Sequence, residues 1–238
     1  MGVAENLNRV RTRIATAARK VGGDPAGVHI VAVTKGVAAP YIAEAMAAGQ
    51  QDFGESRVQE ALAKVGCFPG VTWHLVGHLQ TNKARQAVLC FALIHSLDRL
   101  TLARELDRRA CGAGRVVEAL VQVNVTGEPG KWGVAPADLP RLLTDLSSLE
   151  HLRVRGLMTI GPLVGDPRPA FAGLRELLER AKAKGFASTE LKWLSMGMSD
   201  DYPVAVEEGS NLVRLGRTIF GRLGEEERAC AEDGSIDS

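Results

Sequence analysis

The sequence predicts a single (β/α)8 barrel with an extra helix at its N-terminal end. Short apolar segments rich in β-branched residues alternate with amphipathic helices, and eight such units fit into the 238 residues. Parallel strands need helical crossovers, and a chain slightly above 200 residues lies at the lower size limit of this barrel. No change of composition or Pro/Gly/Ser-rich linker divides the chain. A doubly wound open sheet is the competing architecture.

The first half begins with the extra helix, whose predicted inward face is formed by Leu7, Val10, Ile14, Ala17 and Val21. Four strands then follow, at residues 28–34, 51–53, 73–77 and 92–96. The helices between and after them are expected at 40–48, 56–65, 82–89 and 98–110. In the second of these helices, Val58, Leu62 and Val65 share one apolar face.

The second half repeats the pattern. Strands are expected at residues 116–125, 152–160, 191–195 and 211–216, and helices at 137–149, 169–184 and 203–208. The barrel domain should therefore cover residues 1–223. The polar remainder, 224–238, is expected to be a disordered tail.

The composition excludes several classes of protein. A net charge of +1 and isolated tryptophans give no support to nucleic-acid binding or to an acidic membrane surface. No apolar run approaches the roughly 20 residues of a membrane span, and the N-terminal segment lacks the apolar core of a signal peptide. Four scattered cysteines without a CxxC pair fit a reducing compartment. We therefore expect a cytoplasmic protein.

Metal binding is not expected. His74 and His78 have H-x3-H spacing, but their segment reads as a strand followed by a turn, whereas that motif needs a helix to bind zinc. No third ligand is evident. His74 is interpreted as a core histidine, and His78 is placed on a loop where it could contact a ligand.

Lys35 is the leading candidate for chemistry. In such a barrel the active site lies at the C-terminal ends of the strands, and Lys35 directly follows the first of them. Partial desolvation there would favour the neutral, nucleophilic amine. The alternative is a lysine that extends its stem along the strand end and its charge into solvent.

A phosphate site is predicted after the last two strands. Gly197 and Ser199 open a short helix, Gly216 permits close approach of a ligand to the backbone, and Arg217 adds a cation. Helix capping by Ser199 or Asp200 is the alternative. Arg214 lies within an apolar strand and needs a partner, which is either a ligand atom inside the barrel or a carboxylate on an outer helix.

Several long motifs identify a family resemblance. Besides Lys35 these are GESRVQE, WHLVGHLQTNKAR, NVTGEPGKWGV, RGLMTIGP, LSMGMSDDYPVAVEEGS and VRLGRTIFG. Together they resemble the pyridoxal phosphate homeostasis proteins, also called the YggS/PROSC family, over nearly the whole chain up to about Gly221. The family fold is like the N-terminal barrel of alanine racemase without that enzyme's second domain.

The resemblance implies roles for individual residues. Lys35 is similar to the residue that forms a Schiff base with pyridoxal 5′-phosphate (PLP), and Arg214 to the partner of the pyridine nitrogen. The phosphate would be held by Ser199, by the backbone of Gly216 and Arg217, and by the nearby Thr218. Ser56 stands where the family has Asn, and Arg217 where many members have Thr or Ser. Ser56, Met158 and His78, all at strand ends, complete the expected cofactor site.

The implied chemistry is weak. A guanidinium is not a proton acceptor in proteins, so the ring nitrogen beside Arg214 would stay neutral and stabilise a carbanion poorly. A racemase of this fold also needs a facing base, usually tyrosine, and neither Tyr41 nor Tyr202 is placed as one. We expect a PLP carrier with little or no catalysis, which buffers the cofactor or delivers it to PLP-dependent apo-enzymes. A monomer is expected because no dimerisation domain is evident.

Two alternatives remain from the sequence. One is a PLP-dependent amino-acid racemase. The other is a class I aldolase-like barrel in which Lys35 forms a Schiff base with a sugar phosphate.

Overall fold

Eight parallel strands close into a barrel in the order of the chain, β1 to β8. The structure, a computed structural model, describes residues 2–186 and 191–221. Closure comes from the pairing of β8 with β1, in which Val31 stands opposite Arg214 and Ala32 opposite Leu215. The predicted (β/α)8 barrel is confirmed, and the open sheet is excluded.

The strands, in chain order, are β1 (His29–Val33), β2 (Asp52–Glu55), β3 (Thr72–Leu75), β4 (Leu93–Leu97), β5 (Val117–Gln122), β6 (Leu152–Met158), β7 (Trp193–Ser195) and β8 (Leu212–Leu215). The helices are α1 (Val3–Lys20), α2 (Ala39–Ala47), α3 (Val58–Val65), α4 (Ala84–Cys90), α5 (Leu100–Gly112), α6 (Leu139–Leu146), α7 (Arg168–Ala183), α8 (Tyr202–Glu207) and α9 (Arg217–Phe220). Two short 3-10 helices, η1 (Pro25–Gly27) and η2 (Thr81–Lys83), complete the described elements.

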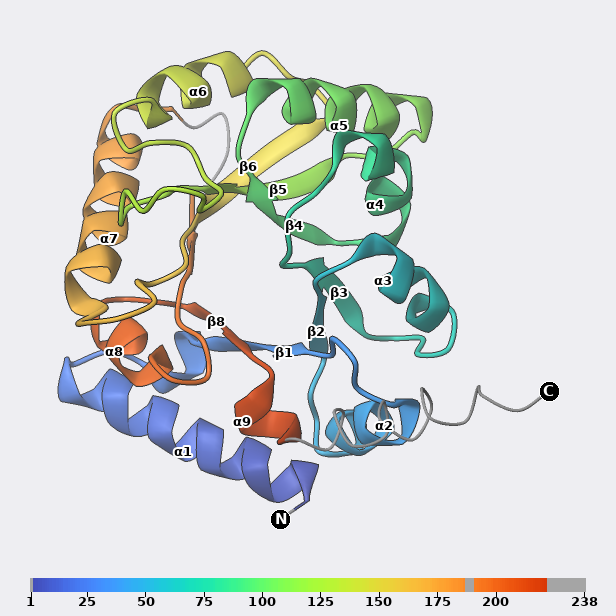
Figure 1. Cartoon of the computed structure of the whole chain (residues 1–238), viewed down its shortest axis with the longest axis vertical. Coiled ribbons are helices and arrows are strands. Elements are labelled where there is room, and N and C mark those ends of the chain that lie inside the picture. The colour runs from blue at the N-terminus through green and yellow to red at the C-terminus, as the bar shows by residue number, and fades with distance from the viewer. Residues whose placement is uncertain (1, 187–190, 222–238) are drawn as a thin grey trace.

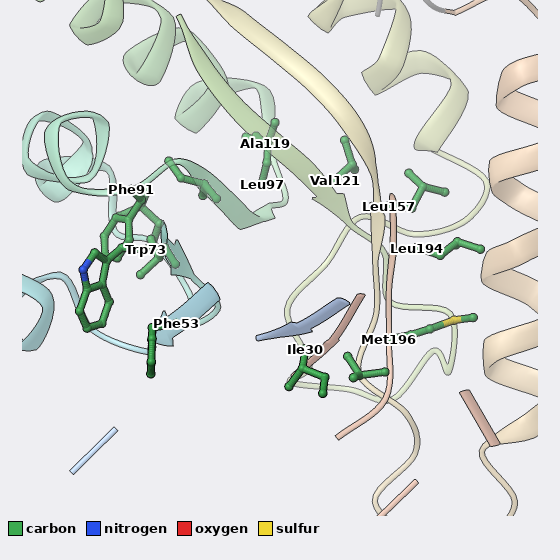
Figure 2. Packing of buried hydrophobic residues seen from close by; sticks show 14 of the residues in the cluster. Ile30, Phe53, Trp73, Phe91, Leu97, Ala119, Val121, Leu157, Leu194 and Met196 are labelled. Carbon is green, nitrogen blue, oxygen red and sulfur yellow. The ribbon is translucent and has the colours of Figure 1, made fainter. Parts of the chain in front are cut away.

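The side chains of the strands alternate between two hydrophobic clusters. Outward side chains pack against the surrounding helices and form the main core, as Ile30, Phe53 and Leu157 illustrate (Figure 2). Inward side chains fill the barrel with a smaller cluster of Val31, Leu93, Leu120, Met158 and Leu212. The barrel interior is therefore packed, and ligands are restricted to its mouth.

Helix α1 lies outside the ring of barrel helices, alongside α8 and α9 (Figure 1). Leu7, Val10 and Ile14 are buried in this contact, as the periodicity predicts. The prediction for Val21 is wrong, because α1 ends at Lys20 and Val21 is 52% exposed. The chain turns away at Gly22, which adopts the left-handed conformation (φ 72°) that favours glycine at helix ends.

Three other details differ from the expectation. Leu62 of α3 is 48% exposed, although Val58 on the same helix is buried. Helix α6 is shorter than 137–149 and ends at Leu146. The hydroxyl groups of Ser147 and Ser148 donate to the carbonyl oxygens of Thr144 and Asp145 in its last turn. The segment after β8, for which no helix range was predicted, contains the short helix α9.

Two expectations concern the chain as a whole. Within the described ranges, no helix has the length and apolar character needed to cross a membrane. The expected disordered tail, 224–238, lies outside the described residues.

The packing of α1 leads to a stability prediction. Leu7→Ala removes a fully buried side chain and should lower the free energy of unfolding by about 2–5 kcal/mol in urea titrations. Arg19→Ala, on the exposed face of the same helix, is the control and should change it by less than about 0.5 kcal/mol. Equal effects of the two substitutions would contradict the packing role of α1.

Candidate functional site

Lys35 stands just beyond β1, on backbone that is held by two neighbouring elements. The preceding residue, Thr34, accepts a hydrogen bond at its carbonyl oxygen from Lys64 Nζ, at 2.6 Å. Its hydroxyl group donates to Glu55 Oε1, also at 2.6 Å. Lys64 is in turn ion-paired with Glu55, whose side chain is fully buried. These contacts fix the position from which the Lys35 side chain extends.

The Lys35 side chain lines a pocket of about 500 Å³ at the C-terminal ends of the strands. The structure leaves Lys35 exposed, not partly desolvated as expected from the sequence. Arg57 and Lys83 add further cations to the lining, which includes no aspartate or glutamate. Ser56 and His78, both predicted at the site, line the same pocket. An anionic molecule is therefore favoured there.

One wall of the pocket is aromatic. His78 stacks on Trp132, with ring centroids 3.7 Å apart and planes 17° from parallel. Burial lowers the pKa of His78 below its usual value, against the opposing effect of Asp98 at 3.4 Å, so the imidazole is neutral at pH 7. The neighbour of Trp132, Lys131, holds this loop by donating to Glu128 and to the Gly161 carbonyl oxygen, both at 2.8 Å.

A glycine brings two pocket loops into backbone contact. A Cβ atom on Gly77 would lie 2.1 Å from the Ser56 carbonyl oxygen, far inside van der Waals contact. The loops that follow β2 and β3 therefore pack directly against each other. Any side chain at position 77 would push Ser56 from the pocket wall.

Arg214 is buried and points into the barrel, which resolves the alternative left open by the sequence. Its guanidinium donates to Ser195 Oγ at 2.6 Å and to the Thr159 carbonyl oxygen at 2.9 Å. No carboxylate among the described residues forms an ion pair with it, and desolvation lowers its pKa to about 10. The group stays charged at pH 7, and its remaining N–H donors are available to an acceptor in the mouth.

The predicted phosphate residues are brought together at the start of α9. Ser199 Oγ accepts from the Thr218 backbone N–H at 3.2 Å, and Thr218 Oγ1 donates to the Ser199 carbonyl oxygen at 3.3 Å. Gly216 packs against Val33, whose carbonyl oxygen would lie 3.3 Å from an added Cβ. The Arg217 side chain is exposed and pairs with Asp200, so only its backbone faces this corner.

A chain of polar side chains crosses the barrel interior. From Arg214 it continues through Ser195 Oγ to His95 Nδ1 (2.9 Å), from His95 Nε2 to His74 Nδ1 (3.0 Å), and from His74 Nε2 to Asp52 Oδ1 (3.3 Å). We call these five residues the interior chain. His74 is buried and hydrogen-bonded, as expected of a core histidine. Desolvation lowers the pKa of His95 well below 6.5, and His74 and Arg214 lower it further.

The chain matches the family model of the alanine racemase N-terminal domain over residues 6–223. It is 42% identical over 224 residues to the pyridoxal phosphate homeostasis protein of Pseudomonas aeruginosa, covering 92% of this chain and 95% of that protein. The corresponding protein of Aquifex aeolicus is 39% identical and is covered to 98%. The chain belongs to the pyridoxal phosphate homeostasis protein family. A solved structure of the family, PipY of Synechococcus elongatus with PLP bound, is 41% identical with a TM-score of 0.80, and the match covers 92% of this chain and 100% of PipY.

The residues that the family resemblance selects fall into three parts of the mouth. Lys35, Ser56 and His78 line the pocket. Ser199, Gly216 and Thr218 form the corner at α9. Arg214, on β8, is buried, and its guanidinium bonds Ser195 of β7 and the Thr159 carbonyl oxygen just after β6. Met158 is fully buried in the inner hydrophobic cluster. In the described part of the chain, no group of three His, Cys, Asp or Glu side chains could hold a metal ion.

Sequence reasoning missed Trp132 and the lower part of the interior chain. Trp132 lies seven residues beyond the strand segment expected to end at Val125, so no strand end marks it. His95 and Asp52 both bond His74, which lies on a strand distant from each of them in the sequence. The only sign of these contacts in the sequence is a polar residue at an inward position of each strand.

The buried Glu55 gives a stability prediction. Lys64→Met keeps the aliphatic stem but leaves the Glu55 carboxylate without its cation, which should cost about 3–5 kcal/mol of unfolding free energy. Lys182→Met breaks an exposed pair with Glu179 and, as the control, should cost less than about 1 kcal/mol. Urea unfolding of both variants tests this, and a small loss in Lys64→Met would show that Glu55 does not need its partner.

The lowered pKa of His95 predicts a pH dependence of stability. Below about pH 6.5 the unfolded chain binds a proton at this residue that the folded chain does not, so the unfolding free energy falls as the pH is lowered. The slope is at most about 1.4 kcal/mol per pH unit for one proton. His95→Asn should remove this contribution, measured as the difference between the two proteins from pH 7 to pH 5. Parallel pH profiles would contradict a buried neutral His95.

Proposed function

We propose that this protein binds PLP and takes part in cofactor homeostasis, holding PLP covalently on Lys35. The observation that carries the proposal is the Lys35 amine in a cationic pocket at the barrel mouth. An amine condenses with an aldehyde to form a C=N bond with loss of one water, and an exposed amine held on a fixed backbone is suited to this. The family name and the PLP bound in PipY support the same cofactor.

The remaining residues fit the other groups of PLP. The Ser199 hydroxyl and the backbone N–H groups at the start of α9 would bind the phosphate, since the first N–H groups of a helix have no partner within it. Arg214 would donate to the pyridine nitrogen from its buried position. His78 and Ser56 would lie beside the ring.

The same residues argue for holding the cofactor with little or no catalysis. Arg214 offers donors alone, so it leaves the ring nitrogen unprotonated and its electron-withdrawing power low. A facing tyrosine is the base that a racemase of this fold would use. Tyr202 is fully buried beneath Arg13 of α1, and Tyr41 packs against the main core. The relatives are also named for homeostasis, not for an enzymatic activity.

Buffering and delivery are the roles that suit such a site. An exposed Lys35 can be approached by an incoming amine, whether a small molecule or a lysine of a PLP-dependent apo-enzyme, which would replace it on the cofactor. We further propose that the protein is a monomer of the cytoplasm. The three cysteines in the described ranges are free thiols, which accords with a reducing compartment.

A spectrum tests the proposal. The purified protein with PLP should be yellow, bleach on borohydride reduction and carry one reduced adduct, located by peptide mass spectrometry on Lys35. Lys35→Ala should lose the adduct, whereas Lys83→Ala, at another lysine of the same pocket, should keep it. An adduct that persists in Lys35→Ala would refute the assignment. Solvent deuterium entering Cα of alanine at enzymatic turnover rates would instead favour a racemase.

A further inference from the structure

The interior chain connects the mouth of the barrel with the opposite end of the fold. Arg214 and Ser195 lie at the C-terminal ends of β8 and β7, whereas Asp52 is the first residue of β2. The four residues from Arg214 to His74 are buried, and only Asp52, whose side chain is 27% exposed, reaches solvent. The proposed contacts with PLP involve Arg214 and do not account for the buried polar side chains of Ser195, His95 and His74. Without a hydrogen-bond partner, each of these side chains would carry a desolvation cost.

The two ends of the interior chain determine the direction of its hydrogen bonds. A guanidinium only donates and a carboxylate only accepts. The Asp52 carboxylate accepts from His74 Nε2, and in the singly protonated form of His74 its Nδ1 accepts from His95 Nε2. His95 Nδ1 is then unprotonated and accepts a hydrogen bond from the Ser195 hydroxyl group. The reverse order would turn a ring nitrogen lone pair of His74 toward the Asp52 carboxylate.

This direction constrains the contact with Arg214. A free hydroxyl can rotate and present either its proton or its lone pairs to a neighbour. Because the Ser195 proton is committed to His95, the lone pairs of Oγ face the guanidinium, 2.6 Å away. The Thr159 carbonyl oxygen is the second fixed acceptor. Two acceptors, one on β7 and one directly after β6, hold the planar guanidinium in one orientation.

We propose that Ser195 and the residues behind it position the Arg214 guanidinium toward the pyridine ring of PLP, an inference that rests on the proposed function. His95, His74 and Asp52 act through Ser195 and do not touch the cofactor. The orientation of Arg214 sets its hydrogen bond to the ring nitrogen, so the interior chain influences both the affinity for PLP and the absorption maximum of the bound cofactor.

The first measurement does not need the cofactor. Imidazole nitrogens with and without a proton have well-separated ¹⁵N chemical shifts, so ¹⁵N-histidine labelling reports the tautomers directly. We expect His74 and His95 to be protonated at Nε2 and not at Nδ1. A protonated Nδ1 on His95 would overturn the proposal, whatever the protein does with PLP.

The second measurement compares two substitutions of His95. His95→Phe keeps a ring in the interior but removes the acceptor for Ser195, whereas His95→Asn retains an acceptor oxygen near the position of Nδ1. Titration with PLP should show about a tenfold loss of affinity and a shifted absorption maximum for His95→Phe. His95→Asn should stay close to the wild-type values. If His95→Phe does not fold, Ser195→Ala removes the Oγ acceptor of Arg214 itself and should give the same two changes.

Leu120→Met is the control for altered packing, because Leu120 is buried in the same barrel interior and lies outside the interior chain. A spectral shift in Leu120→Met as large as that in His95→Phe would overturn the proposal, as would unchanged affinity and spectrum in His95→Phe. Failure of the proposed function is distinguishable from these results. In that case the wild-type protein itself would form no borohydride-reducible adduct on Lys35.

Discussion

The pairing of β1 with β8 is the constraint on which the site depends. Their ladder places Val31 opposite Arg214, and it joins segments at opposite ends of the chain. Lys35 follows β1, and the corner formed by Gly216 and Thr218 follows β8, so closing the barrel brings both to one edge. Without closure, the lysine and the arginine would belong to separate edges of a sheet. The pairing of β1 with β8 therefore both closes the barrel and assembles the site.

Two buried charges at the mouth are stabilised in different ways. Glu55 has a direct cation, Lys64, and its burial ties β2, α3 and the backbone before Lys35 together. Arg214 has neutral acceptors in place of a carboxylate: it donates to the Ser195 hydroxyl oxygen and the Thr159 carbonyl oxygen, and Asp201 acts on it only through its charge, without an ion pair. A cation solvated by oriented dipoles keeps more of its donor capacity for a ligand than one neutralised by a bidentate carboxylate.

The fold and much of the site could be predicted from the sequence because they depend on local patterns. The alternation of β-branched runs and helical periodicity gave the barrel, and the rule that strands end at the site selected Lys35, Ser56 and His78. The register between strands is not a local property. His95 meets Ser195 across 100 positions of the chain, and that contact follows only from the closed barrel. Val21 and Leu62 were predicted to be buried but are exposed. Helical periodicity identifies the apolar face of a helix, but it does not tell how far neighbouring elements cover that face.

The glycine at position 77 has a consequence for redesign of the pocket. Its backbone lies against Ser56, leaving no volume for a side chain of any size. A mutant library intended to change which ligands the pocket accepts can diversify Gln59, Gln80 or Trp132, whose side chains line it. It must leave Gly77 constant, because substitution there would alter the scaffold and not the specificity. The positions at which the pocket can be changed are thus limited by Gly77, a residue without a side chain.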